Sequence, residues 1–317
     1  MSKQRILIIG AAGGLAKILI NLISRQKNNF EITAIDSRTI EDRLESPNIH
    51  YKRVRYTRNN FERLFRQNEF DTVFHLGRIS HVQNSKSLIA TRLDQNIIGT
   101  QNILNLSLKH NTKKVVILST YHVYGALADN PVYLTEDSPL RASIKYPDLR
   151  DVVEMDHIST NWMWKNKEEI QTVILRPCNI IGPQVKNTIS RYLSTPLVPL
   201  PIDFNPMFQF IHEYDMANIL FETIEKVPTG VYNVAPSETI SIKKAKGLVG
   251  ENYLPTPSFL LEGLSSLVST PIWRFPDYLI DYLKFSSIID NSEIIKILGE
   301  DIFQFNTEDT LDLLRIS

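Results

Sequence analysis

A glycine-rich turn near the N-terminus has the residue types and spacing that bind a phosphate group. The sequence GAAGGLA at 10–16 follows an apolar run at 6–9 and precedes apolar residues that recur every three or four positions. Glycines allow a tight turn and a close approach of a pyrophosphate, while unpaired N–H groups at the start of a helix attract anions. We therefore predict a dinucleotide site contacted by Gly10, Ala12, Gly13, Gly14 and Leu15.

An acidic residue stands where such a site requires one. The next predicted strand ends EITAID, and Asp36 lies 20 residues after Ala16. A carboxylate at this spacing binds the adenosine ribose hydroxyls and repels a 2′-phosphate, which favours NAD over NADP. Because Arg38 can accept that phosphate, NADP is not excluded, and we expect Ser37 and Arg38 to border the cofactor. The alternative is a turn with no ligand, but the strand, helix and acid together favour a dinucleotide.

Composition limits the class of protein. The 317 residues contain 35 Lys+Arg and 35 Asp+Glu, so a net charge of zero argues against a nucleic-acid partner. A single cysteine, Cys178, excludes an internal disulfide framework and fits a reducing compartment. The stretch 5–23 is too interrupted by glycines and Lys17 for a signal peptide, and no apolar run is long enough to span a bilayer. We expect a cytoplasmic protein without integral membrane association, and the histidine spacing predicts no metal site.

The pattern of elements predicts the fold class. Apolar runs predict strands at 5–9, 31–35, 49–54, 71–76, 113–119 and 171–176. Helical periodicity predicts helices at 13–26, 59–67, 85–109 and 146–167. This alternation indicates an α/β protein with a Rossmann-type, doubly wound parallel sheet and a small C-terminal substrate lobe. We predict a cofactor domain at 1–178, with a strand returning near 230–235, and a substrate-binding lobe at 179–317.

Several longer segments resemble one enzyme family. They are FDTVFHLG at 70–77, NIIGTQNIL at 96–104, VVILSTYHVYG at 115–125, LRPCNIIGP at 175–183 and FQFIHEYDMA at 208–217. Together with YNVAP and IIDNSEIIKILG, they resemble the extended short-chain dehydrogenase/reductases, the NAD-dependent epimerase/dehydratase family. The resemblance covers nearly the whole chain.

The resemblance implies a mechanism and a set of site residues. In such enzymes a Ser or Thr binds the reacting hydroxyl, a Tyr moves its proton, a Lys four residues later supplies positive charge, and hydride passes to NAD. Here these positions are Thr120, Tyr146 and Arg150. The further cofactor contacts implied are Leu76, Gly77, Arg78, Asn96, Ser119, Tyr146, Arg150 and Pro177. The substrate contacts implied are Thr120, Tyr121, His122 and Asn179.

Arginine in place of the lysine is the main departure from the family pattern. On the predicted helix 146–167, Tyr146, Arg150 and Glu154 fall on one face, so Arg150 would keep a positive charge near the phenol. The forked guanidinium group of Arg150 does not reproduce every contact of a lysine. The alternative is structural: Tyr146 packs the helix start beside Pro147, and Arg150 pairs with Glu154.

Further departures concern the substrate. Tyr121 and His122 replace the Asp-Glu pair of the dehydratases, which argues against elimination of water. The segment that often begins with an arginine for a nucleotide diphosphate begins here with Phe208, and the acid that usually approaches adenine is replaced around 56–58. The sequence therefore allows a UDP-sugar as the substrate but does not indicate one.

The leading hypothesis is an atypical NAD-dependent epimerase or oxidoreductase that acts by hydride transfer on a small, sugar-like hydroxylated substrate, with a nucleotide-sugar as one option. The alternative is a catalytically degenerate protein that binds NAD(H) as a sensor or scaffold. A third hypothesis is an NADH-dependent reductase. Relatives commonly dimerise through the helices predicted at 85–109 and 146–167, so the resemblance also implies a homodimer.

Overall fold

The computed structural model describes residues 3–26, 29–77, 92–250, 252–261 and 275–316. The chain forms two compact units. Unit 1 comprises residues 1–120, 151–176 and 216–232, and unit 2 comprises residues 121–150, 177–215 and 233–317. Arg78, which the sequence places beside the cofactor, lies outside the described residues.

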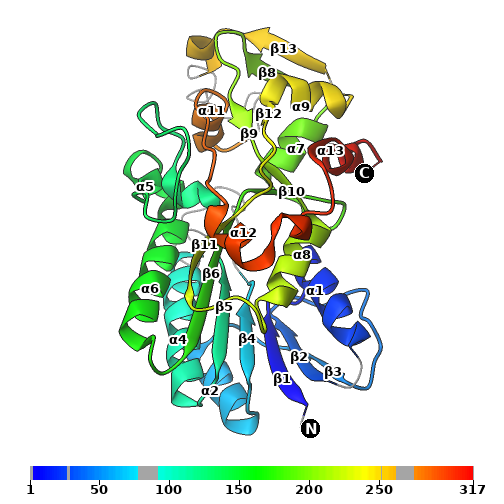
Figure 1. Ribbon diagram of the computed structural model, residues 1–317, viewed down its shortest axis with the longest axis vertical. Coiled ribbons are helices and arrows are strands. Elements are labelled where there is room, and N and C mark those ends of the chain that lie inside the picture. The colour runs from blue at the N-terminus through cyan, green and yellow to red at the C-terminus, as the bar shows by residue number, and fades with distance from the viewer. Residues whose placement is uncertain (1–2, 27–28, 78–91, 251, 262–274, 317) are drawn as a thin grey trace. The chain divides into compact units, whose positions relative to one another are not determined.

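A seven-stranded sheet in the order β11-β6-β5-β4-β1-β2-β3 forms the middle of the Rossmann-like fold (Figure 1). Its strands are β1 Gln4–Ile9, β2 Phe30–Asp36, β3 Ile49–Arg53, β4 Thr72–His75, β5 Lys114–Leu118, β6 Gln171–Pro177 and β11 Gly230–Val234. The pairs from β3 to β6 are parallel. The order reverses beside β1, which is the point where open α/β sheets bind ligands at the carboxyl ends of their strands.

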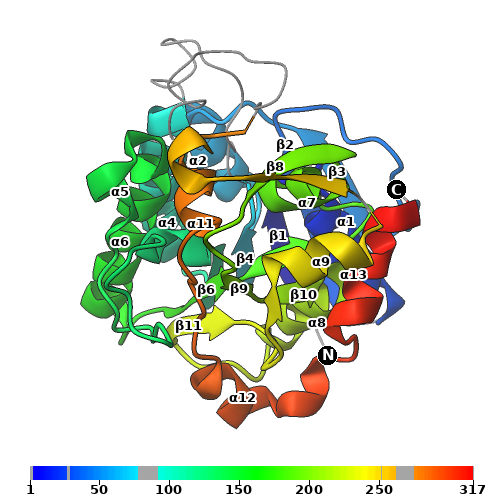
Figure 2. The same ribbon diagram turned by 90° about the horizontal axis from the view of Figure 1, so that it is seen from above.

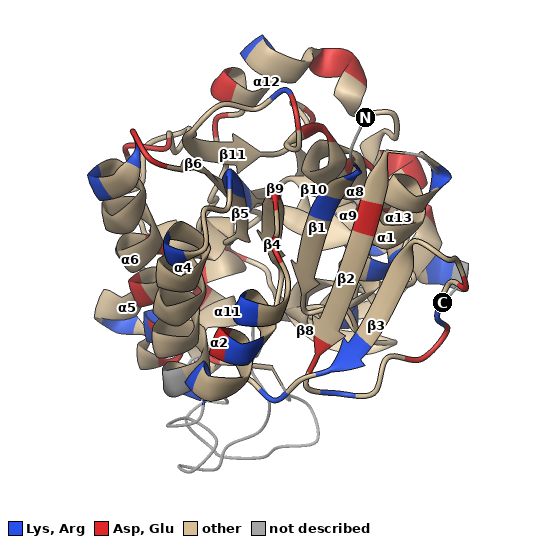
Figure 3. Ribbon diagram, turned by 90° about the horizontal axis from the view of Figure 1, so that it is seen from below, with Lys and Arg blue, Asp and Glu red and all other residues tan. Residues whose placement is uncertain are grey.

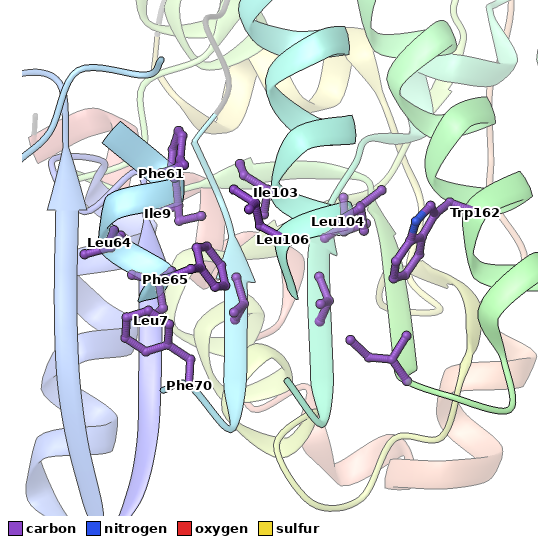
Figure 4. Packing of buried hydrophobic residues seen from close by; sticks show 14 of the residues in the cluster. Leu7, Ile9, Phe61, Leu64, Phe65, Phe70, Ile103, Leu104, Leu106 and Trp162 are labelled. Carbon is purple, nitrogen blue, oxygen red and sulfur yellow. The ribbon is translucent and has the colours of Figure 1, made fainter. Parts of the chain in front are cut away.

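Amphipathic helices bury one face on this sheet. They are α1 Gly14–Arg25, α2 Arg58–Gln67, α4 Gly99–Lys109, α6 Arg150–Asn166 and α8 Glu213–Glu222. Figure 4 shows aromatic and aliphatic side chains of α2 and α4, together with Trp162 of α6, in one cluster with Leu7 and Ile9 of β1. Both β1 residues are fully buried. This packing fixes the ends of β1 and β4, where the glycine turn lies.

Unit 2 is built from short pairs of strands and short helices. The strands are β7 Asn179–Ile181, β8 Leu197–Pro201, β9 Met207–Phe208, β10 Phe210–His212, β12 Ile240–Ser241 and β13 Asn252–Thr256. They pair as β7 with β10, β8 with β13 and β9 with β12. The helices are α5 Ala142–Lys145, α7 Thr188–Ser194, α9 Ile242–Leu248, α11 Tyr278–Tyr282, α12 Ser292–Leu298 and α13 Thr307–Ile316. In Figure 2, α13 lies beside α9, which it contacts.

The structure confirms all six predicted strands to within two residues, and β11 confirms the returning strand. The predicted helix 146–167 is wrong at its start, because α6 begins at Arg150. Tyr146 is extended, with φ −120° and ψ 99°, and is followed by a 3₁₀ turn over Pro147–Leu149. The cause is Pro147, whose ring disfavours a helical conformation of the residue before it. In the described part of the predicted helix 85–109, a π-helical segment, Asp94–Ile98, precedes α4.

Charged residues of both signs are distributed over unit 1. Figure 3 shows basic and acidic positions interspersed along α2 and across the neighbouring strands β1 to β3. Within the described ranges, every helix is too short or too polar to cross a bilayer.

Candidate functional site

The glycine turn joins β1 to α1 in a conformation that requires glycine. Gly10 has φ +94°, and a Cβ there would lie 2.5 Å from the Cα and N of Gly77, at the end of β4. The backbones of the two segments therefore touch. Gly13 occupies the N-cap of α1 and donates its N–H to the Gly10 carbonyl at 2.9 Å. The turn thus presents bare backbone and the N-terminus of a 12-residue helix, which is the arrangement that binds phosphate.

Asp36 connects the glycine turn to the end of β2. Its carboxylate accepts hydrogen bonds from the backbone N–H of Ala12 at 3.0 Å and of Arg38 at 2.8 Å. The Arg38 guanidinium also donates through Nε and Nη2, at 3.2 Å each. Burial alone would raise the pKa of Asp36, but these hydrogen bonds outweigh it and hold the pKa below its ordinary value. A buried carboxylate is therefore charged and fixed beside the turn.

Tyr56 stands where the sequence lacks the acid that usually approaches adenine. Its ring packs on Phe61 with centroids 5.5 Å apart. Its hydroxyl lies against the turn, since a Cβ on Gly77 would be 2.7 Å from it. Burial, followed by the charge of Asp36, raises the pKa of Tyr56, so the phenol stays neutral. The sequence indicated that the usual acid is replaced here, but it did not predict the contact between the Tyr56 hydroxyl and the turn.

The end of β4 carries two of the predicted cofactor residues, Leu76 and Gly77, both half-buried. The preceding His75 is buried, and its Nε2 lies 2.8 Å from Thr100 Oγ1. Burial lowers the pKa of His75 to about 4, so the ring is neutral near pH 7. Thr100 donates its hydroxyl to the Asn96 carbonyl at 2.6 Å, which ties β4 to the π-helical segment.

Asn96 belongs to a buried polar cluster. Its Nδ2 donates to Asp151 Oδ2 at 2.6 Å, and the same oxygen lies 3.3 Å from Arg92 Nε. The π-helical segment that carries Asn96 is of a kind frequent at functional sites. Sequence reasoning selected Asn96 but missed Asp151, which is 55 residues further along the chain, and Arg92, whose contact is with that same distant carboxylate.

Ser119 is held in a second buried network. Its hydroxyl donates to Asp156 Oδ2 at 2.5 Å. Arg176 clamps the same carboxylate with Nε at 3.0 Å and Nη2 at 2.6 Å. Asp156 is 0% exposed and Arg176 3%, so the ion pair is fully desolvated. Thr120, also buried, directly follows Ser119 and is therefore placed by β5 and this network. Sequence reasoning missed this network, although an arginine within the apolar run VILRP indicates a buried charge.

In unit 2, the two substrate candidates Tyr121 and Asn179 contact each other. The Tyr121 hydroxyl donates to Asn179 Oδ1 at 3.0 Å, and Asn179 Nδ2 donates to the Gln209 carbonyl at 3.1 Å. These three residues and Tyr282 surround a gap too small to hold a water molecule. Burial raises the pKa of Tyr121. Both polar atoms of the Asn179 side chain are thus engaged within the protein.

His122 packs among aromatic rings. Its ring centroid lies 4.9 Å from that of Tyr282 and 5.9 Å from that of Tyr278, both on α11. Its carbonyl accepts a hydrogen bond from the Tyr282 hydroxyl at 3.2 Å. Pro177, the last residue of β6, is buried, as is the free Cys178.

Tyr146 and Arg150 do not share a helix face. Tyr146 is half-buried in the extended link between α5 and the 3₁₀ turn, and its ring meets that of Tyr278 edge to face at 6.5 Å. Arg150 is exposed at the first position of α6. The expected alignment of Tyr146, Arg150 and Glu154 along one helix is therefore wrong, and Pro147 is the reason.

A comparison of the chain with known protein families agrees with the glycine turn, Asp36 and the strand order. The chain belongs to the NAD dependent epimerase/dehydratase family, whose model matches residues 6–235. This family consists of NAD-dependent enzymes, as the resemblance of the motifs implied. Across the described residues, no cluster of three or more His, Cys, Asp or Glu is arranged to hold a metal ion.

The similar curated proteins match part of their own length. A Mycobacterium tuberculosis protein of uncharacterised function is 29% identical over 212 residues, which cover 66% of this chain and 56% of that protein. A UDP-glucose 4-epimerase of Pisum sativum is 27% identical over 57% of this chain and 53% of its own. The chain thus spans little more than half the length of these relatives.

Solved structures share the whole fold. DesIV, a dTDP-glucose 4,6-dehydratase of Streptomyces venezuelae with NAD and TYD bound, matches with a TM-score of 0.75 at 18% identity, over 98% of this chain and 96% of that one. A Thermus thermophilus UDP-glucose 4-epimerase in complex with NAD matches with a TM-score of 0.74 at 18% identity, over 98% and 99%. At such identities the likeness concerns the fold.

Proposed function

We propose that the protein binds NAD and uses it to transfer hydride to and from a sugar-like hydroxylated substrate, with nucleotide-sugars as the first class to test. The observation that carries the proposal is the Asp36 carboxylate, fixed at the Ala12 N–H beside a turn that only glycine can form. Family membership supports the reaction class. Relatives named as a UDP-glucose 4-epimerase and a dTDP-glucose 4,6-dehydratase support the substrate class.

The preference for NAD follows from the charge of Asp36. Bound NAD supplies a hydride acceptor, and Asp36 binds the ribose hydroxyls of its adenosine half. A 2′-phosphate brought to this carboxylate would meet a fixed negative charge. Arg38, which could have received the phosphate, already donates to Asp36 through two nitrogens. We therefore propose NAD as the cofactor, with NADP bound more weakly.

For the chemical step, we propose Thr120 as the residue that binds the reacting hydroxyl and Tyr146 as the one that moves its proton. The hydroxyls of Tyr121 and Tyr282 are engaged with Asn179 and with the His122 carbonyl, respectively. Burial raises the pKa of both phenols, which suits them for packing and orientation rather than proton transfer. The proposed mechanism includes no elimination of water, since Tyr121 and His122 replace the dehydratase acids.

A specific observation favours a second candidate, an NAD(H)-binding sensor or scaffold. The exposed Arg150 does not share a helix with Tyr146, and both polar atoms of Asn179 are engaged within the protein. A protein that senses the cofactor needs the glycine turn and Asp36 but no proton-transfer site. Turnover of a sugar substrate separates the two functions, because an enzyme converts the substrate and a sensor does not.

The test is turnover of a panel of UDP- and dTDP-hexoses with NAD, followed by chromatography of the sugar products. We expect at least one sugar to be converted and Tyr146→Phe to abolish the conversion. An epimerase returns the hydride and leaves NADH at its initial level, whereas a reductase consumes NADH stoichiometrically. Turnover that survives in Tyr146→Phe would refute the assignment of the proton carrier.

A further inference from the structure

A phenol needs a neighbouring positive charge to work as a base near neutral pH, because its ordinary pKa is about 10. The sequence analysis assigned this positive charge to Arg150. Tyr146 and Arg150 do not lie on one helix, however, because a 3₁₀ turn that begins at Pro147 separates them. A different cation lies against the ring. The ammonium of Lys145, the residue directly before Tyr146, is 5.3 Å from the centroid of the Tyr146 ring. That distance is within the range of cation–π contact.

The position of Lys145 is fixed by a buried acid. Lys145 is the last residue of α5, and its Nζ lies 2.6 Å from Asp281 Oδ2 and 2.9 Å from Asp281 Oδ1. Asp281 is 2% exposed and sits on α11. The same helix carries Tyr278, whose ring meets Tyr146 edge to face. A single helix therefore holds both the tyrosine ring and the cation above it.

We propose that Lys145, anchored by Asp281, supplies the positive charge that promotes ionisation of the Tyr146 hydroxyl, in place of the lysine that the family carries four residues after its tyrosine. Lys145 is a positioning residue, because it acts through Tyr146. The inference rests on the proposed role of Tyr146 in proton transfer. It extends that role by assigning the charge to a residue that no sequence motif marks.

The other groups near Tyr146 decide the sign of the effect. From α11 come the phenols Tyr278 and Tyr282, and burial raises the pKa of Tyr282. The same helix carries Asp281, whose charge opposes ionisation of the Tyr146 hydroxyl. Lys145 offsets that acid and adds attraction at 5.3 Å. Loss of the lysine removes this attraction while the charge of Asp281 remains. The ionisation of Tyr146 therefore moves to higher pH.

The experiment measures Tyr146 ionisation directly, without substrate or cofactor. Tyrosinate absorption of the full chain is recorded against pH, and the curve of a matched Tyr146→Phe protein is subtracted to isolate one phenol. We expect Lys145→Met to raise the midpoint by about half a pH unit or more, the size of a unit charge at this distance in a largely aqueous medium. Lys145→Arg keeps the charge and should restore the midpoint.

Lys167 provides a matched control. Its ammonium lies 6.0 Å from the Trp164 ring centroid and 3.9 Å from Glu168, and its side chain is 53% exposed against 54% for Lys145. Lys167→Met should leave the Tyr146 midpoint unchanged. An unchanged midpoint in Lys145→Met, or an equal shift in Arg150→Met, would overturn the inference. Because this readout needs no turnover, a failed sugar panel with the expected shift would count against the proposed function alone.

Discussion

Replacement of Gly10 by alanine perturbs the cofactor turn at its tightest point. With φ at +94°, an L-residue pays roughly 1–2 kcal/mol for the backbone conformation. The new Cβ would also lie 2.5 Å from two backbone atoms of Gly77 that no rotamer change can move. Ordinary contact needs the end of β4 to shift by about 1 Å, and overpacking of this kind costs about 1–3 kcal/mol more. We expect the free energy of unfolding to fall by about 2–5 kcal/mol.

Urea unfolding and NADH fluorescence titration measure the two consequences of this substitution. The same shift displaces the backbone that faces the pyrophosphate, so NADH affinity should fall at least about tenfold, the equivalent of about 1.4 kcal/mol. Gly247→Ala is the control, because nothing lies within 4 Å of the added Cβ. On α9 alanine should stabilise by up to about 1 kcal/mol. A Gly10→Ala protein that unfolds and binds NADH like the wild type would refute the account of the turn.

Three further predictions concern charged and titratable groups of unit 1. Asp36→Asn should weaken NADH binding and narrow the difference between NADH and NADPH, because the Arg38 guanidinium is no longer bound by a carboxylate; parallel titrations check this. Asp156→Asn should lower the free energy of unfolding by about 3–5 kcal/mol, because it leaves Arg176 buried without a counter-charge; urea unfolding against Asp312→Asn, an exposed ion pair, gives the comparison. Burial lowers the pKa of His75 to about 4, so the unfolded state takes up its proton first as pH falls. The stability from a neutral His75 is therefore complete above about pH 6.5 and declines toward pH 4 by roughly 3 kcal/mol, and His75→Gln should flatten that part of the unfolding profile.

The sequence predicted the elements whose signals are local. Buried parallel strands appear as short apolar runs, and for that reason β1, β2 and β5 were located to within one or two residues. The turn at 10–14 was recognised because glycine is required where φ is positive and backbones touch. Asp36 was recognised by its distance along the chain from that turn.

What the sequence did not predict depends on contacts between distant segments. The helical periodicity around Tyr146 outweighed Pro147 in the prediction, although a proline constrains the residue before it. The partners of Ser119 and Asn96 lie 37 and 55 residues away, on α6. Lys145 belongs to no sequence motif. Its importance comes from its ion pair with Asp281, which is 136 positions further along the chain. Tertiary packing alone brings these groups together.

The measurement that tests the central claim most directly is a side-by-side fluorescence titration of the purified protein with NADH and NADPH. The fixed charge of Asp36 and its hold on Arg38 predict saturable binding of NADH and weaker binding of NADPH. Equal affinity for both would contradict the role of Asp36 in selecting the cofactor. Failure of either to bind would contradict the account of the glycine turn as a dinucleotide site.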